Sequence, residues 1–166
     1  MKKVAILIEN LFDDQELIYP YHRLREDYEV VLVGSEKDEH YKSKSGLMFK
    51  SDIASEAINA DDFAGIFIPG GFSPDYMRRT AATVDLVKAF DKAKKPIAAI
   101  CHGPWMLASA NAIKGKNVTS VVSIKDDLVH AGGHWVDEEV VVSGHIITSR
   151  SPRDLPALIK TFVSML

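Results

Sequence analysis

Short apolar runs alternate with amphipathic stretches along the whole chain, and this alternation restricts the fold more than any other feature. The short runs are typical of buried strands. The helical periodicity between them is typical of crossover helices around a mostly parallel sheet. We therefore predict an α/β fold. The predicted strands of this sheet are residues 3–8, 29–33, 64–68, 97–100 and 118–122.

Helical spacing of apolar residues and helix-start signals predict the connecting helices. Pro20 should kink or restart the first helix, because proline lacks the N–H that a helix interior needs. Two hairpins are expected, one within residues 40–51 and one that pairs 140–142 with 145–148. The predicted helices are residues 16–27, a helix that starts near 73–74, residues 80–94, 103–113 and 124–131, and a final helix that begins at 151–154.

The 166 residues have the length of one domain, residues 1–166, with no linker, low-complexity segment or internal repeat. The net charge is -3 at pH 7, and no run of Lys or Arg exceeds two residues. The basic stripe that neutralises nucleic-acid phosphates is therefore missing. Composition thus favours a small-molecule partner over a nucleic acid.

The amino terminus and the cysteine usage bear on the cellular compartment. The first apolar run ends at Glu9, so it is too short for a signal peptide or a membrane span. A single cysteine, Cys101, cannot form an intramolecular disulfide. We expect a cytoplasmic protein that binds no membrane.

Cys101 follows the predicted strand 97–100 and precedes a predicted helix, where unpaired N–H groups and the helix dipole favour a thiolate. Gly103 leaves room for the tight strand-to-helix turn that exposes a nucleophile. The alternative is a buried cysteine that acts as a small apolar residue. The loops 10–16 and 69–75 end at the same edge of a parallel sheet, where ligands collect, and this favours the nucleophile.

Candidate partners of this nucleophile lie in the same three loops. The N–H groups of Gly70, Gly71 and His102 are candidate donors to an oxyanion. The His102 side chain serves as a base only if the turn brings both side chains into one pocket. The residues alone leave Glu16 between a solvated carboxylate and an acid of the site. They leave Asp75 between a first-turn helix acid and a functional group.

His130 and His134 are four residues apart, which is the spacing of two metal ligands on one helix face. Gly132 and Gly133 break the helix between them, so the two histidines do not share a face. We expect no metal and no cofactor.

Six stretches of the chain match a known family in the family's own order. They are 16–24 (ELIYPYHRL), 68–71 (IPGG), 99–104 (AICHGP), 124–128 (IKDDL), 135–142 (WVDEEVVV) and 149–155 (SRSPRDL). With these stretches the sequence resembles the intracellular protease PfpI group of the ThiJ/PfpI superfamily over essentially its whole length. Six matches in order are highly specific.

The resemblance implies a flavodoxin-like three-layer sandwich with a mostly parallel central sheet, as in class I glutamine amidotransferases. It implies Cys101 as the nucleophile, His102 as the adjoining triad member and Glu16 as a protonated acid that contacts the thiol. Gly70 and the His102 amide would form the oxyanion hole. The group tends to assemble so that an acid from a neighbouring subunit reaches the histidine. Asp75 matches that position, and a homo-oligomer, dimer or hexamer, is expected.

Two positions depart from the family's pattern. Asp75 stands where the family has a glutamate and is one methylene shorter, which weakens its contact with His102 unless the interface moves closer. Val121 stands where protease-like relatives carry an aromatic residue, so the pocket lacks a hydroxyl group.

The residues and the resemblance together favour a cysteine-dependent hydrolase of the PfpI type, in which the thiolate attacks the carbonyl of a small peptide. An alternative is a glyoxalase or deglycase, in which Cys101 adds to methylglyoxal or glyoxal and a hydroxy acid is released. A third possibility is a stress-response redox sensor or chaperone-like protein in which Cys101 is oxidised.

Overall fold

The structure is a computed structural model that describes residues 1–166. Its central sheet contains the strands β1 (Lys3–Leu7), β2 (Glu29–Gly34), β5 (Ile53–Ala54), β6 (Gly65–Ile68), β7 (Ile97–Ile100), β10 (Val141–Ser143) and β11 (Ile146–Ser149). The strand order is β10-β11-β7-β6-β1-β2-β5. Every pairing is parallel except that of β10 with β11. The mostly parallel sheet is therefore confirmed.

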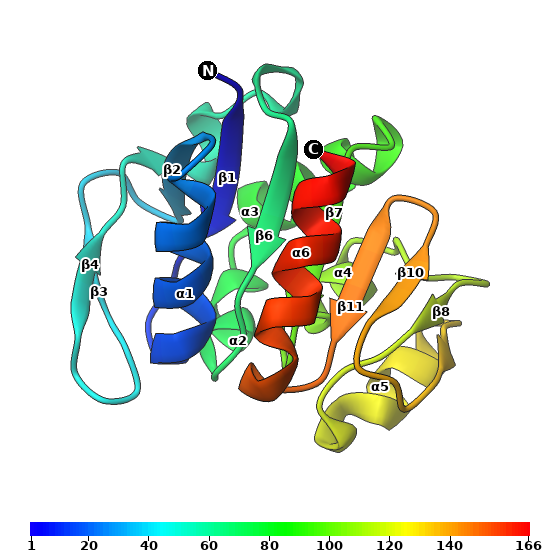
Figure 1. Cartoon of the computed structure of the whole chain (residues 1–166). Helices are drawn as coiled ribbons and strands as arrows, with labels where there is room; N and C mark the ends of the chain where they lie inside the picture. Colours follow the sequence, from blue (N-terminus) through cyan, green and yellow to red (C-terminus); the bar gives the residue numbers. More distant parts are fainter.

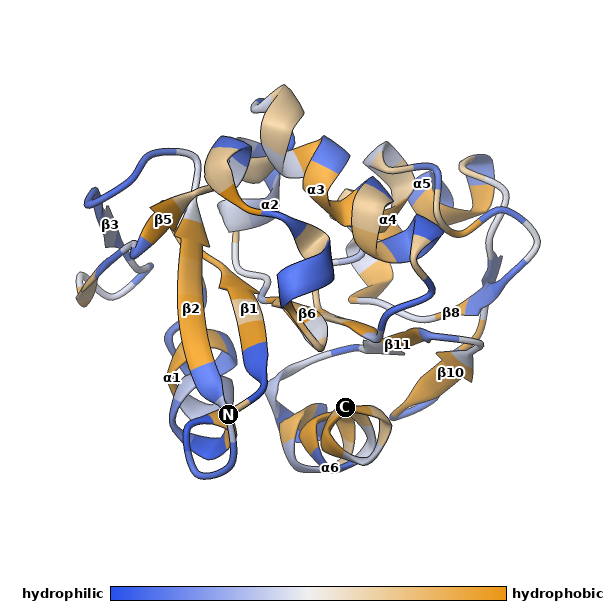
Figure 2. Cartoon of the chain, turned by 90° about the horizontal axis from the view of Figure 1, so that it is seen from above, coloured by the Kyte–Doolittle hydropathy of each residue, from blue (hydrophilic) through white to orange (hydrophobic).

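Helices cover both faces of this sheet and complete three layers (Figure 1, Figure 2). One face carries α1 (Asp14–Leu24) and α6 (Leu155–Met165). The other face carries α2 (Ser73–Met77), α3 (Ala81–Lys92), α4 (Trp105–Ser109) and α5 (Lys125–His130). Short 3-10 helices lie at Ser55–Ala57, Ala60–Asp62, Val122–Ile124 and Pro152–Asp154. The predicted three-layer sandwich is confirmed.

The central sheet separates two hydrophobic cores, because successive side chains of a strand point to opposite faces. Ala5 and Leu7 of β1 belong to the core under α3 and α4, whereas Val4 and Ile6 belong to the core under α1 and α6. All four side chains are fully buried. Burial on both faces explains why the strands read as continuous apolar runs.

The first helix differs from its prediction at both ends and in its middle. It begins at Asp14 because the Asp13 carboxylate accepts hydrogen bonds from the N–H groups of Gln15 and Glu16. It then continues through Pro20 without a break and ends at Leu24. A restart at Pro20 is therefore ruled out, since packing of the helix on the sheet outweighs the one hydrogen bond that proline removes, whereas a kink there stays a prediction.

Two predicted elements near Cys101 are shorter than expected. The helix predicted over 103–113 spans only α4, because the Gly103 N–H bonds the Ile100 carbonyl at 2.7 Å in a turn that precedes it. The strand predicted over 118–122 spans only β8 (Asn117–Val118), which pairs with β9 (His134–Trp135) in a separate sheet. The place beside β7 in the central sheet is occupied by β11.

Both predicted hairpins are present, and one of them is fastened to α1. Strands β3 (His40–Lys42) and β4 (Met48–Lys50) pair antiparallel and stand beside α1 (Figure 1). At the tip, the hydroxyls of Ser43 and Ser45 each donate to Asp14 Oδ1 at 2.6 Å. These bonds hold the hairpin tip against the start of α1.

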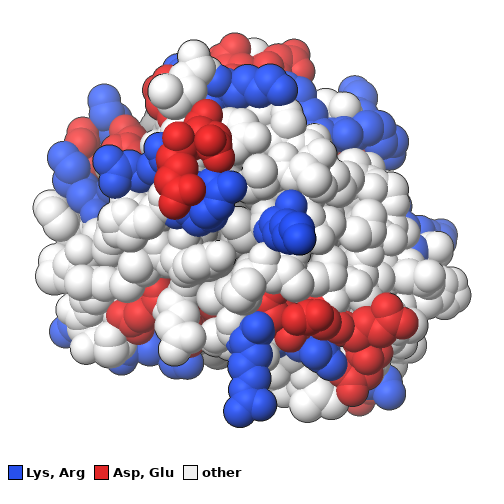
Figure 3. Space-filling view, in the orientation of Figure 1, with Lys and Arg blue, Asp and Glu red and all other residues white.

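The surface of the α1 and α6 side carries no extended patch of one charge (Figure 3). Acidic and basic side chains are interspersed around the edge of this face, and a broad uncharged region crosses its middle. None of the helices combines the length and the apolar character that crossing a membrane requires.

Candidate active site

Cys101 lies on a strained turn directly after β7. Its φ is 61°, in the left-handed region that non-glycine residues rarely adopt, and such a conformation costs about 1–3 kcal/mol. Two hydrogen bonds hold the backbone there: the Cys101 N–H donates to the Ser149 carbonyl, and the Val121 N–H donates to the Cys101 carbonyl, each at 3.1 Å. The predicted sharp strand-to-helix turn is thus present.

Because Gly70 has no side chain, its backbone can lie close to both the Glu16 carboxyl group and the Cys101 side chain. A Cβ atom at Gly70 would lie 2.6 Å from Glu16 Oε2 and 2.8 Å from Cys101 Cβ. The N–H of Gly70 donates to Glu16 Oε2 at 2.6 Å. This amide, predicted as an oxyanion donor, is therefore already bound to the carboxyl group of Glu16.

The amides of Gly71 and His102 act on Cys101 instead, because they lower the pKa of its thiol. Gly71 has a φ of 69°, and a Cβ there would lie 2.5 Å from both the Asp13 nitrogen and the Leu11 oxygen. Neither the Gly71 nor the His102 amide bonds a backbone carbonyl. Of the three amides predicted for an oxyanion hole, these two are therefore the ones that remain without a backbone partner, and their role as donors stays a prediction.

Glu16 is the buried acid of the site. The first turn of α1 carries it inward, and its side chain has no exposed surface. Oε2 accepts the Gly70 N–H, whereas Oε1 has no nitrogen or oxygen partner. The polar neighbour that remains is the thiol of Cys101. The residues alone left Glu16 between solvent and site, whereas the resemblance implied that it contacts the thiol, and in the structure it is buried beside the thiol.

Burial and the negative charge of Asp13 raise the pKa of Glu16 to about 8, against the lowering effect of the Gly70 amide. Glu16 is therefore mainly protonated at neutral pH, since removal from water disfavours the charged form. A protonated carboxyl group can donate its O–H to a thiolate.

Burial, followed by the charge of an ionised Glu16 and its hydrogen bond, raises the pKa of the Cys101 thiol to about 12. The amides of His102 and Gly71 lower this pKa. Protonation of Glu16 removes the repulsion and turns the same hydrogen bond into one that stabilises the thiolate. The protonated state of Glu16 is therefore the one that supports a reactive Cys101.

His102 places both ring nitrogens against side chains of its own chain. Nδ1 lies 3.5 Å from the Cys101 sulfur, and Nε2 lies 3.3 Å from Ser123 Oγ. Burial and the positive charge of Lys44 lower the pKa of His102, so that the ring is neutral at pH 7. The turn thus brings the two side chains within hydrogen-bonding distance, and the base role of His102 stays a prediction.

Asp75 does not join this cluster within one chain. It lies in the first turn of α2 and pairs with Arg79. Its expected role at a neighbouring subunit's histidine stays a prediction. Val121 contributes its N–H to the Cys101 carbonyl and adds no hydroxyl to the pocket.

The residues alone give no sign that Ser123 lies beside His102 or that the charge of Lys44 acts on its ring. Ser123 is 21 residues away from His102 and Lys44 lies on a separate hairpin, so no spacing signal connects them. Only the folded loops bring the three together.

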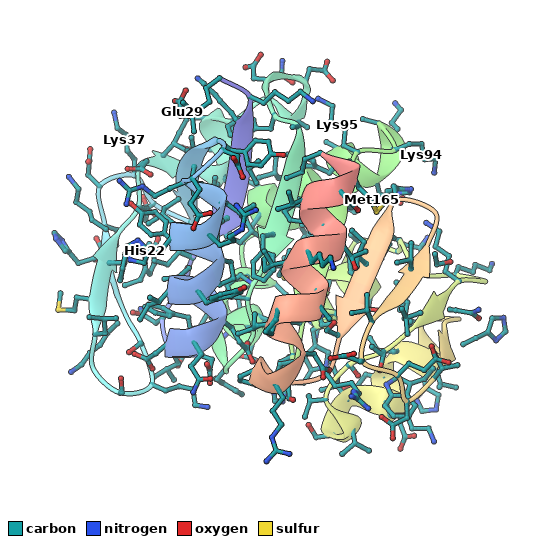
Figure 4. The ribbon with its side chains drawn as sticks, in the orientation of Figure 1. His22, Glu29, Lys37, Lys94, Lys95 and Met165 are labelled. Atoms are coloured by element: carbon teal, nitrogen blue, oxygen red, sulfur yellow. The ribbon has the colours of Figure 1, made fainter.

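A separate groove of about 580 Å³ lies between α1 and the start of α6 and contains neither Cys101 nor His102. His22, which lines it, projects from α1 (Figure 4). No cluster of three or more potential metal ligands occurs in the structure.

Comparison with known proteins supplies the family context for this site. The sequence model of the DJ-1/PfpI family matches residues 2–165. A Pyrococcus abyssi protein named as a deglycase is 44% identical over 164 residues, 99% of both chains. Deglycase PfpI of Pyrococcus furiosus is 40% identical over 164 residues, again 99% of both. A solved two-domain protein of Anabaena variabilis, with DJ-1/ThiJ/PfpI-like and ferritin-like domains, superposes with a TM-score of 0.97 at 40% identity. That match covers 99% of this chain and 48% of the longer one.

Proposed function

Because the chain belongs to the DJ-1/PfpI family, we propose that it is a Cys101-dependent enzyme that removes methylglyoxal or glyoxal adducts from amines and converts the dicarbonyl to a hydroxy acid. The observation that carries the proposal is the thiol of Cys101, held on a strained turn between Glu16 and the free amides of Gly71 and His102. Relatives named as deglycases support this reaction over the peptide hydrolysis that the sequence favoured.

The reaction begins when His102 takes the proton of the Cys101 thiol and the thiolate attacks the carbon that bears the amine, which leaves with that proton. On a free aldehyde, the thiolate adds to the carbonyl carbon, and the oxygen takes up the negative charge. The amides of Gly71 and His102 donate to that oxygen. Both routes lead to the same hemithioacetal on Cys101.

His102 then moves a proton from the carbon that bears sulfur to the neighbouring carbonyl carbon, and the hydroxyl proton on the first carbon passes to the oxygen of the second. The product is a thioester of the hydroxy acid on Cys101, which one water molecule cleaves to restore the thiol. One dicarbonyl and one water yield one hydroxy acid, so that no external oxidant or reductant is needed. Glu16 holds its proton toward the sulfur through these steps.

The test follows the loss of a methylglyoxal adduct of a blocked lysine together with the formation of lactate. An enzyme that consumes only free methylglyoxal cannot clear the adduct faster than the adduct dissociates unaided. We expect the enzyme to remove the adduct faster than the adduct dissociates by itself. Removal at the rate of unaided dissociation would contradict deglycation and would indicate a glyoxalase that acts on free methylglyoxal. Cys101→Ala should lower the rate by about 10³-fold or more. Ser164→Ala, at the exposed end of α6, is the matched control.

Peptide hydrolysis is the second candidate function. A thiol 3.5 Å from a histidine nitrogen, with two amide donors beside it, also fits acyl transfer. Wild type should then cleave small peptide amides faster than Cys101→Ala. Equal rates from the two proteins would remove this candidate.

Redox sensing stays a prediction, supported by the Cys101 thiol beside the buried Glu16. Mass spectrometry after mild peroxide treatment tests it, and failure to find selective oxidation of Cys101 would contradict it. The expected dimer or hexamer also stays a prediction, which the apparent mass in solution tests.

A further inference from the structure

His102 has two side-chain partners, one on each ring nitrogen. We propose that Ser123 is a positioning residue for His102: its hydroxyl accepts the Nε2–H, which leaves Nδ1 to take the proton of the Cys101 thiol. This inference rests on the proposed Cys101 chemistry. It gives one chain a complete Cys101–His102–Ser123 relay.

The loop that carries Ser123 is bound to the nucleophile itself. Val121 donates its N–H to the Cys101 carbonyl at 3.1 Å, and Ile124 donates to the Val121 carbonyl at 3.2 Å. Ile124 is 1% exposed and anchors the loop in the core. The short 3-10 helix Val122–Ile124 therefore presents Ser123 at a fixed position relative to Cys101, although Ser123 itself is exposed.

The tautomer of a neutral histidine decides which nitrogen is basic. With the proton on Nδ1, the ring can only donate to the sulfur and cannot accept the thiol proton. With the proton on Nε2, Nδ1 accepts that proton and the Ser123 oxygen accepts the Nε2–H. The same oxygen can accept the Nε2–H after proton transfer, so the ring need not turn during the reaction.

The carboxylates nearest to this side of the site are bound elsewhere. Asp127 accepts the indole N–H of Trp105 at 2.7 Å, and Asp75 pairs with Arg79. Trp105 packs against the His102 ring with a centroid distance of 5.0 Å. Within one chain, Ser123 is thus the group at Nε2. The ionisable groups that contact His102, act on its charge or pack across Trp105 are Cys101, Lys44, Arg78 and Asp127.

The experiment compares Ser123→Ala and Ser123→Thr with wild type and with Ser164→Ala as a serine-to-alanine control. The rate of Cys101 alkylation by iodoacetamide is measured across a pH series. Ser123→Ala should move the midpoint of the profile to higher pH and slow alkylation at neutral pH by about tenfold, since one hydrogen bond to the imidazolium is lost. Ser123→Thr keeps the hydroxyl and should restore the rate.

Nitrogen NMR of His102 gives a second readout, with the signal assigned through a His102→Gln variant. Wild type should hold its proton mainly on Nε2, and Ser123→Ala should shift the proton toward Nδ1. An alkylation profile and a tautomer identical to wild type in Ser123→Ala would overturn the proposal. So would a loss of reactivity in Asp75→Asn with none in Ser123→Ala, which would identify a neighbouring subunit's carboxylate as the partner.

Failure of Ser123→Thr to restore the rate would also overturn the proposal, because it would show that the hydroxyl is not the cause. Neither readout needs a substrate. Absence of deglycation would therefore contradict the proposed function while the role of Ser123 is still tested. Circular dichroism and thermal unfolding should show the same fold for Ser123→Ala and Ser164→Ala, since both residues are exposed.

Discussion

At the carboxyl edge of the central sheet, Cys101 stands at a φ of 61° and Oε1 of Glu16 has no nitrogen or oxygen partner. At the amino edge, Lys95 donates to three backbone carbonyls, those of Ala60, Asp61 and Phe63, at 2.7 to 2.9 Å. Lys94 and Lys95 lie at the end of the molecule opposite to the start of α1 (Figure 4).

The contrast separates groups that hold the fold from groups that are available for chemistry. At the amino edge, Asp91 accepts from His145 at 2.8 Å and from Lys116 at 3.3 Å, so its charge is balanced. Lys94 also has a positive φ, 56°, but it directly follows the end of α3, where that conformation is common. A strained turn after a strand and a buried acid with one unpaired oxygen occur together at Cys101, and such features collect at functional sites.

Among substitutions at the carboxyl edge of the sheet, Gly71→Ala should have the largest effect on stability. The new Cβ would meet the backbone of Asp13 and Leu11 at 2.5 Å, in addition to the cost of a φ of 69°. We expect a loss of about 3 kcal/mol in the free energy of unfolding, measured by urea denaturation. Gly144→Ala is the matched control, because its φ is 63° and nothing lies within 4 Å. It should cost about 1 kcal/mol. Equal losses would mean that close approach at Gly71 is unimportant.

Glu16→Gln should reveal the raised pKa of Glu16 as a pH-dependent difference in stability. In the unfolded chain Glu16 ionises near 4.5, whereas in the folded protein it keeps its proton until about pH 8. Between these values the folded state binds one more proton, so wild-type stability falls as pH rises. Relative to Glu16→Gln, wild type should lose on the order of a few kcal/mol across this window and no more above it. A difference that does not vary with pH would show that Glu16 is ionised in the folded protein.

The amino edge should respond to mutation without an effect on the proposed reaction. Lys95→Met removes three charge-assisted hydrogen bonds and should lower the free energy of unfolding by about 1–2 kcal/mol. The exposed Lys92→Met at the end of α3 is the control and should change stability little. The kcat/KM for the dicarbonyl should be that of wild type in both. A lower kcat/KM in Lys95→Met alone would contradict the view that the amino edge contributes to stability and not to the reaction.

The smallest expected effect concerns the strain at Cys101. Cys101→Gly and Cys101→Ala should both be inactive, but glycine adopts a φ of 61° without penalty. Cys101→Gly should therefore be more stable than Cys101→Ala by about 1 kcal/mol in thermal unfolding. If the alanine variant is the more stable one, then the turn is not strained.

Much of the fold could be predicted from local sequence patterns. The strands of the sheet core are continuous apolar runs because both of their faces are buried, and such runs are visible without a structure. Cys101 could be proposed as a nucleophile for the same local reason, since it follows such a run and precedes Gly103 and Pro104. Its family was equally visible, because short motifs in a fixed order survive in the sequence.

Other features depended on contacts between distant residues. The helix does not restart at Pro20, because packing outweighs a local preference, and the strand predicted at 118–122 was too long because β11 takes the place beside β7. The donation of the Gly70 amide to Glu16 joins residues 54 positions apart.

The sequence by itself thus determined the layers, the core strands and the residue that carries the thiol, because each depends on neighbours along the chain. The family resemblance implied that Glu16 contacts the thiol. Only the tertiary structure decided that the Gly70 amide binds Glu16, that Gly71 and His102 keep free amides, and that Ser123 meets His102. These relations depend on how separate loops meet at one edge of the sheet. The spacing of these residues in the sequence does not predict their contacts.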